Sequence, residues 1–515
     1  MASDVNLTDF LLFRHIDEGR GSWPALHYRD RTLSYEEVAI LVRKAAAVLE
    51  KYDVGRGDFV SLLVPDSPAF VVTFFAALML GAIAVPLNSQ LPTSDVDDIL
   101  ARVRPKVFII DKSRTAGVRT DLAKTTIRCG DLEAARSIFE HQLDSSGPTA
   151  TAAVRAEGQL AYCLFSSGTT GRPKGILHRH RDILHCVEAY CIPTLRMTSN
   201  DRVLAVPKLA FGYGLGGNLL AAFYVGGSSI LVPEPSSGIS MLEAARTWSP
   251  TLFLGQPRAL GQLLQLDLKP GFGSVRLAVT AGEVLVPALY DRWRETMDIE
   301  LLDGFGTTEV GHVFISNEIG HVIPGSAGKV LPPFKIRLLD ESRNPVGEGV
   351  IGHLWVSGPS MSPGYLGEPD RTAAAFVDGW ICTGDLARRE ADGTVFFAGR
   401  ADEMIKAGCG EWVAPTELEA LLLSHADVVD AAVVGASDEL GVVAPKAFVV
   451  LASGVQPDLA LESKLKGLAV ERWPSLSYKH ISSVVFLDEL PRTSTGKLRR
   501  FMLQPATLTE FSYEC

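Results

Sequence analysis

Short apolar segments alternate with helical patterns through much of the chain, and this alternation is what most constrains the fold. A capping-box spacing from Ser34 to Glu37 opens a helix whose apolar residues then recur at helical spacing. The short apolar segments lie at residues 59–64, 107–110, 202–206, 229–232, 252–254 and 277–280. Because buried parallel strands have continuous apolar runs of this length, the pattern predicts layered α/β structure.

The most apolar stretch, Pro68 to Leu87, has almost no polar side chain and is long enough to cross a bilayer. Gly81 and Pro86 interrupt it, and no cluster of Lys or Arg flanks either end. A buried helix over 69–80 followed by a buried strand over 82–87 explains the same residues. We therefore expect no membrane association.

The pattern changes after about residue 320. Apolar runs at 335–339, 351–356 and 394–397 lie close together between Gly, Pro and Asp turns, which is typical of an antiparallel β unit. The last segment, from about residue 402, carries its own helical and strand patterns. At 515 residues the chain exceeds what one hydrophobic core usually organises, so at least two domains are expected.

The charge and the cysteine content indicate which partners and which cellular compartment suit this protein. The net charge is −11, the isoelectric point is about 5.6, and no long basic block is present, so nucleic acid is a poor partner. Seven irregularly spaced cysteines without a Cys-x-x-Cys pair favour free thiols in a reducing compartment. The acidic N-terminus lacks the basic region of a signal peptide. These features predict a cytoplasmic location.

One loop has the composition of a phosphate-binding site. It follows the apolar pair at 164–165, its glycines allow backbone N–H groups to turn toward an anion, and its hydroxyls add donors. It does not match the Gly-x-x-x-x-Gly-Lys-Ser/Thr loop of the common NTPases, and a flexible surface loop is the alternative. Its candidate residues are Ser166, Ser167, Gly168, Thr169, Thr170 and Lys174.

This loop resembles the signature loop of the acyl-adenylate-forming superfamily, which contains acyl- and aryl-CoA ligases, adenylation domains of peptide synthetases and firefly luciferase. Four further segments resemble other motifs of that superfamily and follow in the same order: 304–309, 379–385, 399–402 and 491–497. The resemblance therefore covers nearly the whole chain.

The resemblance implies ATP, Mg²⁺ and coenzyme A as cofactors and co-substrates. Attack of a carboxylate on the α-phosphate of ATP brings two anions together, so the site must neutralise charge. Thr308 is then placed to bond the α-phosphate, Glu309 is the Mg²⁺ ligand, and Lys174 supplies charge to the phosphates. Lys497 reaches in from the C-terminal domain during adenylation.

The resemblance also assigns the nucleoside contacts. Asp385 accepts the ribose hydroxyls, and Arg400 donates to the same sugar. Phe305 stands where the family usually has Tyr, so it keeps the ring face for adenine and loses the hydroxyl. The remaining candidates for the nucleotide are Gly282, Glu283, Asp303, Gly304, Gly306 and Thr307.

In this superfamily a small C-terminal domain rotates between an adenylating and a thioester-forming pose. The implied division is a large domain over 1–400 and a small, mobile α+β domain over 401–515, with a hinge at about 400–402. Asp402 occupies the usual pivot, and Lys406 is a second candidate. The run 405–415 is one residue longer than the family's, so either Gly408 or Gly410 lines the pantetheine channel.

The segments 208–216 and 308–317 look most like those of benzoate-CoA ligases. The implied pocket for a flat, small acid, such as benzoate or 2-aminobenzoate (anthranilate), is bordered by Ala210, Phe211, Tyr213, Gly214, His312 and Ile315. Ordinary core aromatics and a satisfied histidine are the alternative.

Three function hypotheses follow. The first is an aryl-CoA ligase that consumes an aromatic acid, ATP and coenzyme A. The second is a stand-alone adenylation enzyme that loads a carrier-protein thiol. The third, a nucleotide-binding pseudoenzyme, is disfavoured because Lys174, Glu309 and Lys497 are all present. A homo-oligomer remains open.

The histidines at 178, 180 and 185 lie close together in the sequence. They do not form a His-Glu-x-x-His motif, so we expect solvated or loop-packing side chains and no zinc site.

Overall fold

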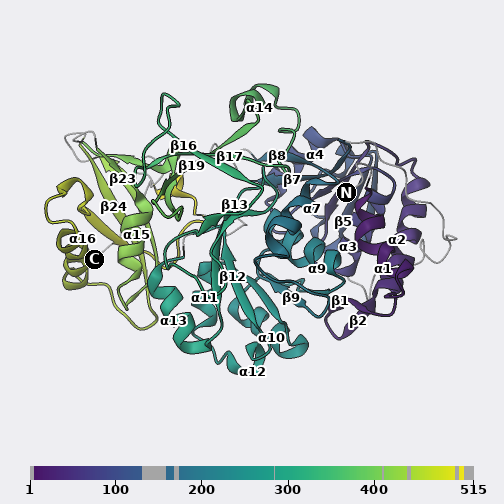
Figure 1. The fold of residues 1–515 in the computed structure, drawn as a ribbon, viewed down its shortest axis with the longest axis horizontal. Helices are drawn as coiled ribbons and strands as arrows, with labels where there is room; N and C mark the ends of the chain where they lie inside the picture. The colour runs from purple at the N-terminus through teal and green to yellow at the C-terminus, as the bar shows by residue number, and fades with distance from the viewer. Residues whose placement is uncertain are drawn as a thin grey trace.

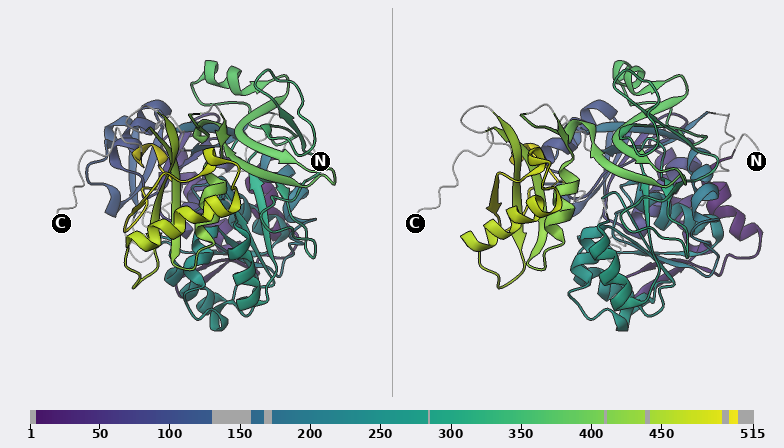
Figure 2. Two further views of the ribbon diagram at one scale, coloured as in Figure 1. Left: turned by 90° about the vertical axis from the view of Figure 1, so that its left-hand side faces the viewer. Right: turned by 60° about the vertical axis from the view of Figure 1, so that its left-hand side comes forward.

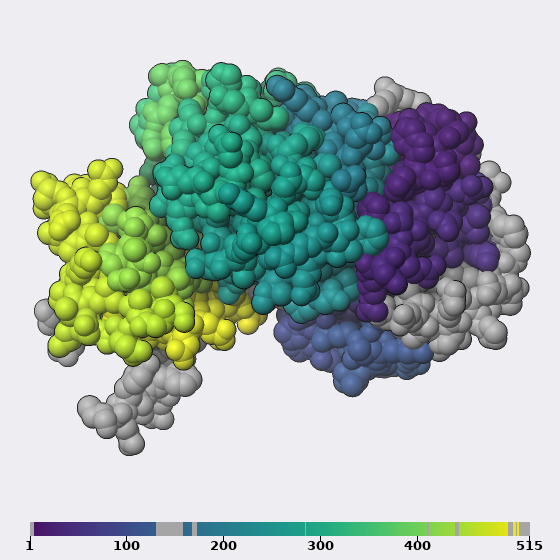
Figure 3. Space-filling model, turned by 90° about the horizontal axis from the view of Figure 1, so that it is seen from below, coloured from purple at the N-terminus to yellow at the C-terminus, as the bar shows by residue number. Residues whose placement is uncertain are grey.

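The computed structural model describes residues 5–129, 158–166, 173–283, 285–408, 411–437, 442–492 and 498–503. Figure 1 shows an elongated molecule with the N-terminal helices near one end and the C-terminal elements at the other. The space-filling view from below shows the same progression along the surface (Figure 3).

The first sheet has six strands. Its strands are parallel except for the last pair, β7 and β8, which is antiparallel. The strands, in spatial order, are β6 (Thr125–Cys129), β5 (Val107–Asp111), β3 (Phe59–Leu63), β4 (Ile83–Pro86), β7 (Leu160–Ser166) and β8 (Lys174–Arg179). Helix α4 (Thr93–Val103) connects β4 to β5.

The apolar stretch from Pro68 to Leu87 lies in the region of this sheet. Helix α3 (Pro68–Met79) connects β3 to β4, and all twelve of its residues are buried. The expected helix followed by a strand is confirmed. No helix in the described residues is long and apolar enough to span a bilayer.

The second sheet has nine strands, with a parallel centre and antiparallel edges. Its order is β15 (Lys329–Val330), β14 (Val313–Ser316), β13 (Leu301–Gly306), β12 (Leu277–Ala281), β11 (Leu252–Gly255), β9 (Arg202–Ala205), β10 (Ser228–Leu231), β1 (Pro24–Tyr28) and β2 (Arg31–Ser34). Associated helices are α2 (Tyr35–Glu50), α10 (Gly238–Trp248), α11 (Pro257–Leu263) and α13 (Pro287–Met297). Ser34 caps α2 with the predicted capping box.

The third sheet is the expected antiparallel unit. It contains β16 (Lys335–Leu339), β17 (Gly352–Ser357), β19 (Trp380–Arg389), β18 (Phe376–Val377) and β20 (Val395–Arg400), which pairs with β19. The register of β19 and β20 sets Asp385 opposite Arg400.

The C-terminal elements build a core of their own, with Leu418, Val433 and Leu465 at its centre. They are the hairpin β21 (Ile405–Lys406) and β22 (Trp412–Val413), the sheet β23 (Val428–Ser437), β24 (Val443–Leu451) and β25 (Ser483–Phe486), and the helices α15 (Pro415–Leu423) and α16 (Leu459–Arg472). Figure 2 shows these elements to one side of the larger unit. The predicted fold class is confirmed, whereas the boundary at 400–401 and the hinge stay predictions.

Candidate active site

Two strand ends bracket the predicted phosphate loop. Ser166 ends β7 and Lys174 begins β8, and the two residues face each other across the antiparallel pair. Four loop residues predicted to bind phosphate lie outside the described residues: Ser167, Gly168, Thr169 and Thr170. The hairpin geometry therefore places Lys174 at the point where the loop rejoins the sheet.

Lys174 forms an ion pair with Glu309, which lies just after β13 and is 7% exposed. The Lys174 Nζ also donates to the Tyr365 hydroxyl at 3.3 Å, and that hydroxyl donates to Glu309 Oε1 at 2.9 Å. Burial alone would raise the pKa of Glu309, but the charge of Lys174 and these hydrogen bonds hold it below its usual value. Glu309 is therefore a buried carboxylate that stays ionised.

Tyr365 was missed by the sequence prediction. Its segment runs along the edge strand β8: Leu366 N–H donates to the Gly175 carbonyl at 2.8 Å, and Leu177 N–H donates to the Gly364 carbonyl at 3.2 Å. These bonds carry the Tyr365 ring to the Lys174 side chain, whose Nζ lies 4.9 Å from the ring centroid. The only local signal was the turn sequence Pro-Gly before Tyr365.

The donor set suits a magnesium ion that arrives with a nucleotide. No group of three His, Cys, Asp or Glu side chains in the described part of the chain could hold a metal on its own. Mg²⁺ usually binds through one or two carboxylates together with substrate phosphates and water, so a single buried carboxylate beside a phosphate loop is sufficient. Glu309 fits this role.

Asp385 and Arg400 form the candidate ribose site. The Arg400 Nη1 donates to Asp385 Oδ1 at 3.0 Å and to the Thr383 carbonyl at 2.9 Å. Gly384, within β19, has a φ of +75°, and a Cβ there would lie 2.9 Å from the Arg400 guanidinium, so this position favours glycine. The ion pair sets the Asp385 carboxylate of β19 beside the Arg400 guanidinium at the end of β20.

The candidate adenine site is aromatic on one side and polar on the other. The Phe305 ring stacks on Phe397 at 5.6 Å and meets the edge of Phe314 at 5.6 Å. Asp303, two residues earlier on β13, accepts from Thr280 Oγ1 at 2.9 Å, and burial raises its pKa to about 7. Gly304 and Gly306 pack on β14, where a Cβ on Gly306 would lie 2.4 Å from the His312 carbonyl.

Glu283 links the larger unit to the C-terminal elements. Its Oε1 lies 3.8 Å from Arg492 Nη1, and Arg492 also donates to both carboxylate oxygens of Asp430 at 2.7 and 2.9 Å. Gly282, beside it, has a φ of +90°. Arg492 was not predicted from the sequence. It is the last described residue before the segment 493–497, so Lys497 itself lies outside the described residues.

The candidate acyl pocket is walled by rings that surround His312. The Tyr213 and Tyr190 rings lie 5.6 and 5.7 Å from the His312 ring, and Tyr213 donates to the Val279 carbonyl at 3.2 Å. Burial lowers the pKa of His312 to about 4, so the imidazole is neutral at pH 7. Gly216 packs on the same ring, where a Cβ would lie 2.5 Å from Cδ2. The wall therefore has no room for larger side chains.

The other pocket candidates lie on neighbouring backbone. Phe211 precedes the short turn α8 (Gly212–Gly214), and Ala210 is buried. A Cβ on Gly214 would lie 2.3 Å from two backbone carbonyls, so only glycine fits there. Ile315, fully buried on β14, faces Phe305 across the strand pair.

The hinge candidates are more exposed than the phosphate cluster. Asp402 Oδ1 lies 3.4 Å from Arg400 Nε, and both side chains are about one-third exposed. The Lys406 Nζ lies 5.6 Å from the centroid of Trp412, which is 48% exposed. Gly408 N–H donates to the Val443 carbonyl at 2.9 Å, whereas Gly410 lies outside the described residues.

The expectation of solvated or loop-packing histidines was wrong for His178, which is buried on a strand, and right for His180, which is buried in the turn after that strand. His178 lies on strand β8 with no exposed surface, and its Nε2 bonds the Thr308 carbonyl at 2.7 Å. His180 is 5% exposed, and its Nδ1 accepts the Leu7 N–H at 3.2 Å. The polar neighbours of His178 in the sequence do not reveal its burial, because its partner Thr308 lies 130 residues away.

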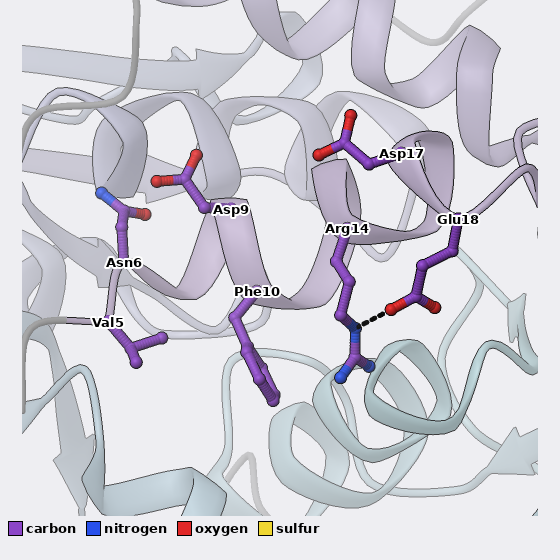
Figure 4. A pocket seen from close by; sticks show the side chains of 7 residues that line it. All are labelled: Val5, Asn6, Asp9, Phe10, Arg14, Asp17 and Glu18. Carbon is purple, nitrogen blue, oxygen red and sulfur yellow. Dashed lines mark ion pairs between the residues drawn. The ribbon is translucent and has the colours of Figure 1, made fainter. Parts of the chain in front are cut away.

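A surface hollow lies along residues 5–18. It is lined by Val5, Asn6, Asp9, Phe10, Arg14, Asp17 and Glu18 (Figure 4). Arg14 pairs with Glu18 there at 3.9 Å and donates to the Tyr224 carbonyl at 2.6 Å. None of the predicted site residues contributes to it.

Known proteins resemble this chain over nearly its whole length. The model of the AMP-binding enzyme family matches residues 13–366, and that of the AMP-binding enzyme C-terminal domain matches residues 417–497. Benzoate–CoA ligase of Thauera aromatica is 33% identical over 97% of this chain and 96% of its own length. The p-hydroxybenzoic acid–AMP ligase FadD22 of Mycobacterium marinum is 32% identical over 98% of this chain and 69% of its own length.

A solved structure is equally similar. The crystal structure of the anthranilate CoA ligase AuaEII in complex with anthranoyl-AMP superposes with a TM-score of 0.92 at 32% identity, covering 98% of this chain and 97% of that one.

Proposed function

The chain belongs to the AMP-binding enzyme family, and from that premise we propose that it is an aryl-CoA ligase. It activates a benzoate-type acid with ATP and transfers the aroyl group to coenzyme A. The products are aroyl-CoA, AMP and pyrophosphate.

The observation that carries this proposal is the segment 306–312, which serves both halves of the site. Glu309 at its centre pairs with Lys174 at the phosphate loop, and His312 at its end joins Tyr190 and Tyr213 in the aromatic wall. An acid held against this wall presents its carboxylate toward the phosphate cluster. The likeness to benzoate–CoA ligase and to the anthranoyl-AMP complex supports a benzoate-sized ring.

In the first step an oxygen of the carboxylate attacks the α-phosphorus of ATP, and pyrophosphate leaves. Lys174 offsets the negative charge of the phosphates, and the Thr308 hydroxyl donates a hydrogen bond to the α-phosphate. Asp385 and Arg400 hold the ribose, and the Phe305 ring borders the adenine. Glu309 would hold Mg²⁺ together with the phosphates, and the ion would supply further charge neutralisation.

In the second step the thiol of coenzyme A attacks the acyl carbonyl, and AMP leaves. We propose that residues 401–515 turn about Asp402 between these steps. Lys497 then serves the adenylation only, whereas Lys406 and Gly408 approach the pantetheine. The exposed contacts at Asp402 and Trp412 are consistent with surfaces that change partners.

The test is a substrate panel of benzoate, 2-aminobenzoate, hydroxybenzoates and octanoate, with release of pyrophosphate and formation of thioester measured separately. We expect the highest kcat/KM for benzoate or an ortho-substituted benzoate, with aliphatic acids beyond six carbons at least about tenfold worse. Octanoate turned over as well as benzoate would contradict the flat pocket.

The second point to test is which thiol accepts the aroyl group. The likeness to FadD22, an acid–AMP ligase, favours as the alternative an enzyme that loads a carrier-protein thiol. Coenzyme A and a phosphopantetheinylated carrier protein, offered to the same preformed aroyl-AMP, discriminate the two. Faster transfer to the carrier protein would replace the CoA assignment.

We place the reaction in the cytoplasm. Cys129, Cys163, Cys186, Cys191 and Cys382 are free thiols, which suits a reducing compartment.

A further inference from the structure

Every backbone carbonyl from Thr308 to Val310 is held by a group from another segment. The Thr308 carbonyl accepts from His178, the Glu309 carbonyl accepts from Ser362 N–H at 2.8 Å, and the Val310 carbonyl accepts from Ser360 Oγ at 2.7 Å. Two of these partners belong to the segment that carries Tyr365. The third, His178, comes from β8.

His178 has the properties of a fixed donor. A carbonyl oxygen can only accept, so the ring nitrogen that faces Thr308 must carry the hydrogen. The ring stacks on Tyr162 at 5.0 Å, and its Nδ1 lies 3.7 Å from Asp182 Oδ2. Asp182 is itself held by the Arg179 N–H at 2.8 Å. These contacts leave the imidazole one orientation.

The chain turns sharply at the point where His178 bonds it. Gly311 has a φ of +97°, and its N–H is shared between the Thr307 and Thr308 carbonyls at 3.1 Å each. A Cβ on Gly311 would lie 3.5 Å from His178 Cε1. The histidine therefore packs against the inside of the turn that presents Glu309 to Lys174.

We infer that His178 is a positioning residue, which sets the place of Thr308 and Glu309 for binding Mg·ATP. The inference rests on the proposed ATP-dependent function. His178 bonds the backbone of the turn, so its loss should act through the turn and weaken nucleotide binding before any chemistry occurs.

The test compares binding of Mg·ATP by calorimetry, without acid or coenzyme A, in the full chain and in His178→Leu. We expect about tenfold weaker binding, since a hydrogen bond to a buried carbonyl is lost. His178→Gln, whose amide donor has nearly the reach of Nε2, should restore the affinity. His178→Asn, one bond shorter, should not.

His15 provides the matched control. It is also fully buried, and its Nε2 bonds a backbone carbonyl, that of Phe223, at 2.6 Å. It lies on α1 (Arg14–Asp17), at the end of the molecule away from the C-terminal elements (Figure 1). His15→Leu should lower the melting temperature and leave the Kd for Mg·ATP unchanged.

Equal losses of affinity in His178→Leu and His15→Leu would overturn the inference. If His178→Leu does not fold, the Gln and Asn variants decide, and equal affinities for these two would overturn it. A wild-type protein that does not bind Mg·ATP would refute the proposed function itself and the inference with it.

Discussion

The phosphate side of the site and the side contributed by the C-terminal elements are built differently. The phosphate side is buried: Glu309 is 7% exposed and has bonds from Lys174 and Tyr365, which come from distant parts of the larger unit. On the C-terminal side, the Asp402 side chain is 39% exposed, and Trp412 is 48% exposed. One side is held in a single geometry, whereas the other consists of contacts that water can replace.

The difference has an energetic meaning. A buried charge that loses its partner is strongly destabilising, whereas a solvent-exposed ion pair contributes about 0–1 kcal/mol. The buried cluster can therefore be preorganised for charge that develops in a transition state. The exposed contacts can break and re-form at little cost, as a two-step enzyme with a rotating domain requires.

The largest effect is expected at the buried cluster. Lys174→Met should slow adenylation by about 10²–10³, the range for loss of one preorganised charge-stabilising donor. The rate of ATP–pyrophosphate exchange measures this loss of adenylation. Lys446→Met is the matched control, because Lys446 Nζ also lies over a ring, that of Phe448 at 5.5 Å, in the C-terminal sheet. Similar losses in both variants would remove the contrast between the two sides.

The next effect tests the proposed pivot. Asp402→Pro fixes the backbone dihedral that rotation must change, so formation of thioester should slow by about tenfold or more while release of pyrophosphate persists. Single-turnover measurements of each step separate the two. Asp402→Ala is the control and should retain both steps. A proline variant with normal thioester formation would place the pivot elsewhere.

A smaller effect is expected where the two sides meet. Arg492→Ala removes the contact with Glu283, and because such partly exposed pairs contribute up to about 1 kcal/mol, adenylation should fall by at most about fivefold. Thioester formation from preformed aroyl-AMP should not change. Glu283→Gln, which spares the Asp430 pair, should give the same result. A hundredfold loss of adenylation rate would mean that the Arg492–Glu283 contact belongs to the rigid phosphate side of the site.

The smallest effect concerns stability on the buried side. Burial raises the pKa of Asp303 from 3.8 to about 7, so the native state keeps this proton at pH values where the unfolded chain has lost it. The resulting contribution to stability is complete below about pH 4 and is lost as the pH rises through 7. Asp303→Asn should therefore lose less stability than the wild type between pH 5 and pH 8, as urea denaturation would show. If the free energy of unfolding had the same pH dependence in Asp303→Asn and in the wild type, the raised pKa of Asp303 would be contradicted.

Much of the fold was predictable because its signals are local. The six apolar segments of the first 280 residues are strands in the structure within about one residue, and the Ser34 capping box is present. Burial of both faces of parallel strands requires such runs, so the pattern survives in the sequence without any knowledge of partners.

Only some of the site residues could be predicted from the sequence. Glu309, Asp385 and Arg400 could be named because each belongs to a compact motif, and the structure pairs them with Lys174 and with each other. Tyr365, His178 and Arg492 could not, because their contacts with Glu309, Thr308 and Asp430 each span 56 or more residues of chain. His178 lies in a motif-poor stretch, where its composition indicated solvent exposure.

The sequence by itself determined which segments are buried, how they alternate, and which short motifs carry charge and hydroxyls for phosphate. These properties depend on neighbours along the chain, because the hydrophobic effect buries apolar segments according to their local pattern. The tertiary structure decided which buried polar groups meet. A carboxylate or imidazole is tolerated inside only when a partner arrives from another strand or turn, and the tertiary packing of these segments brings the two groups together.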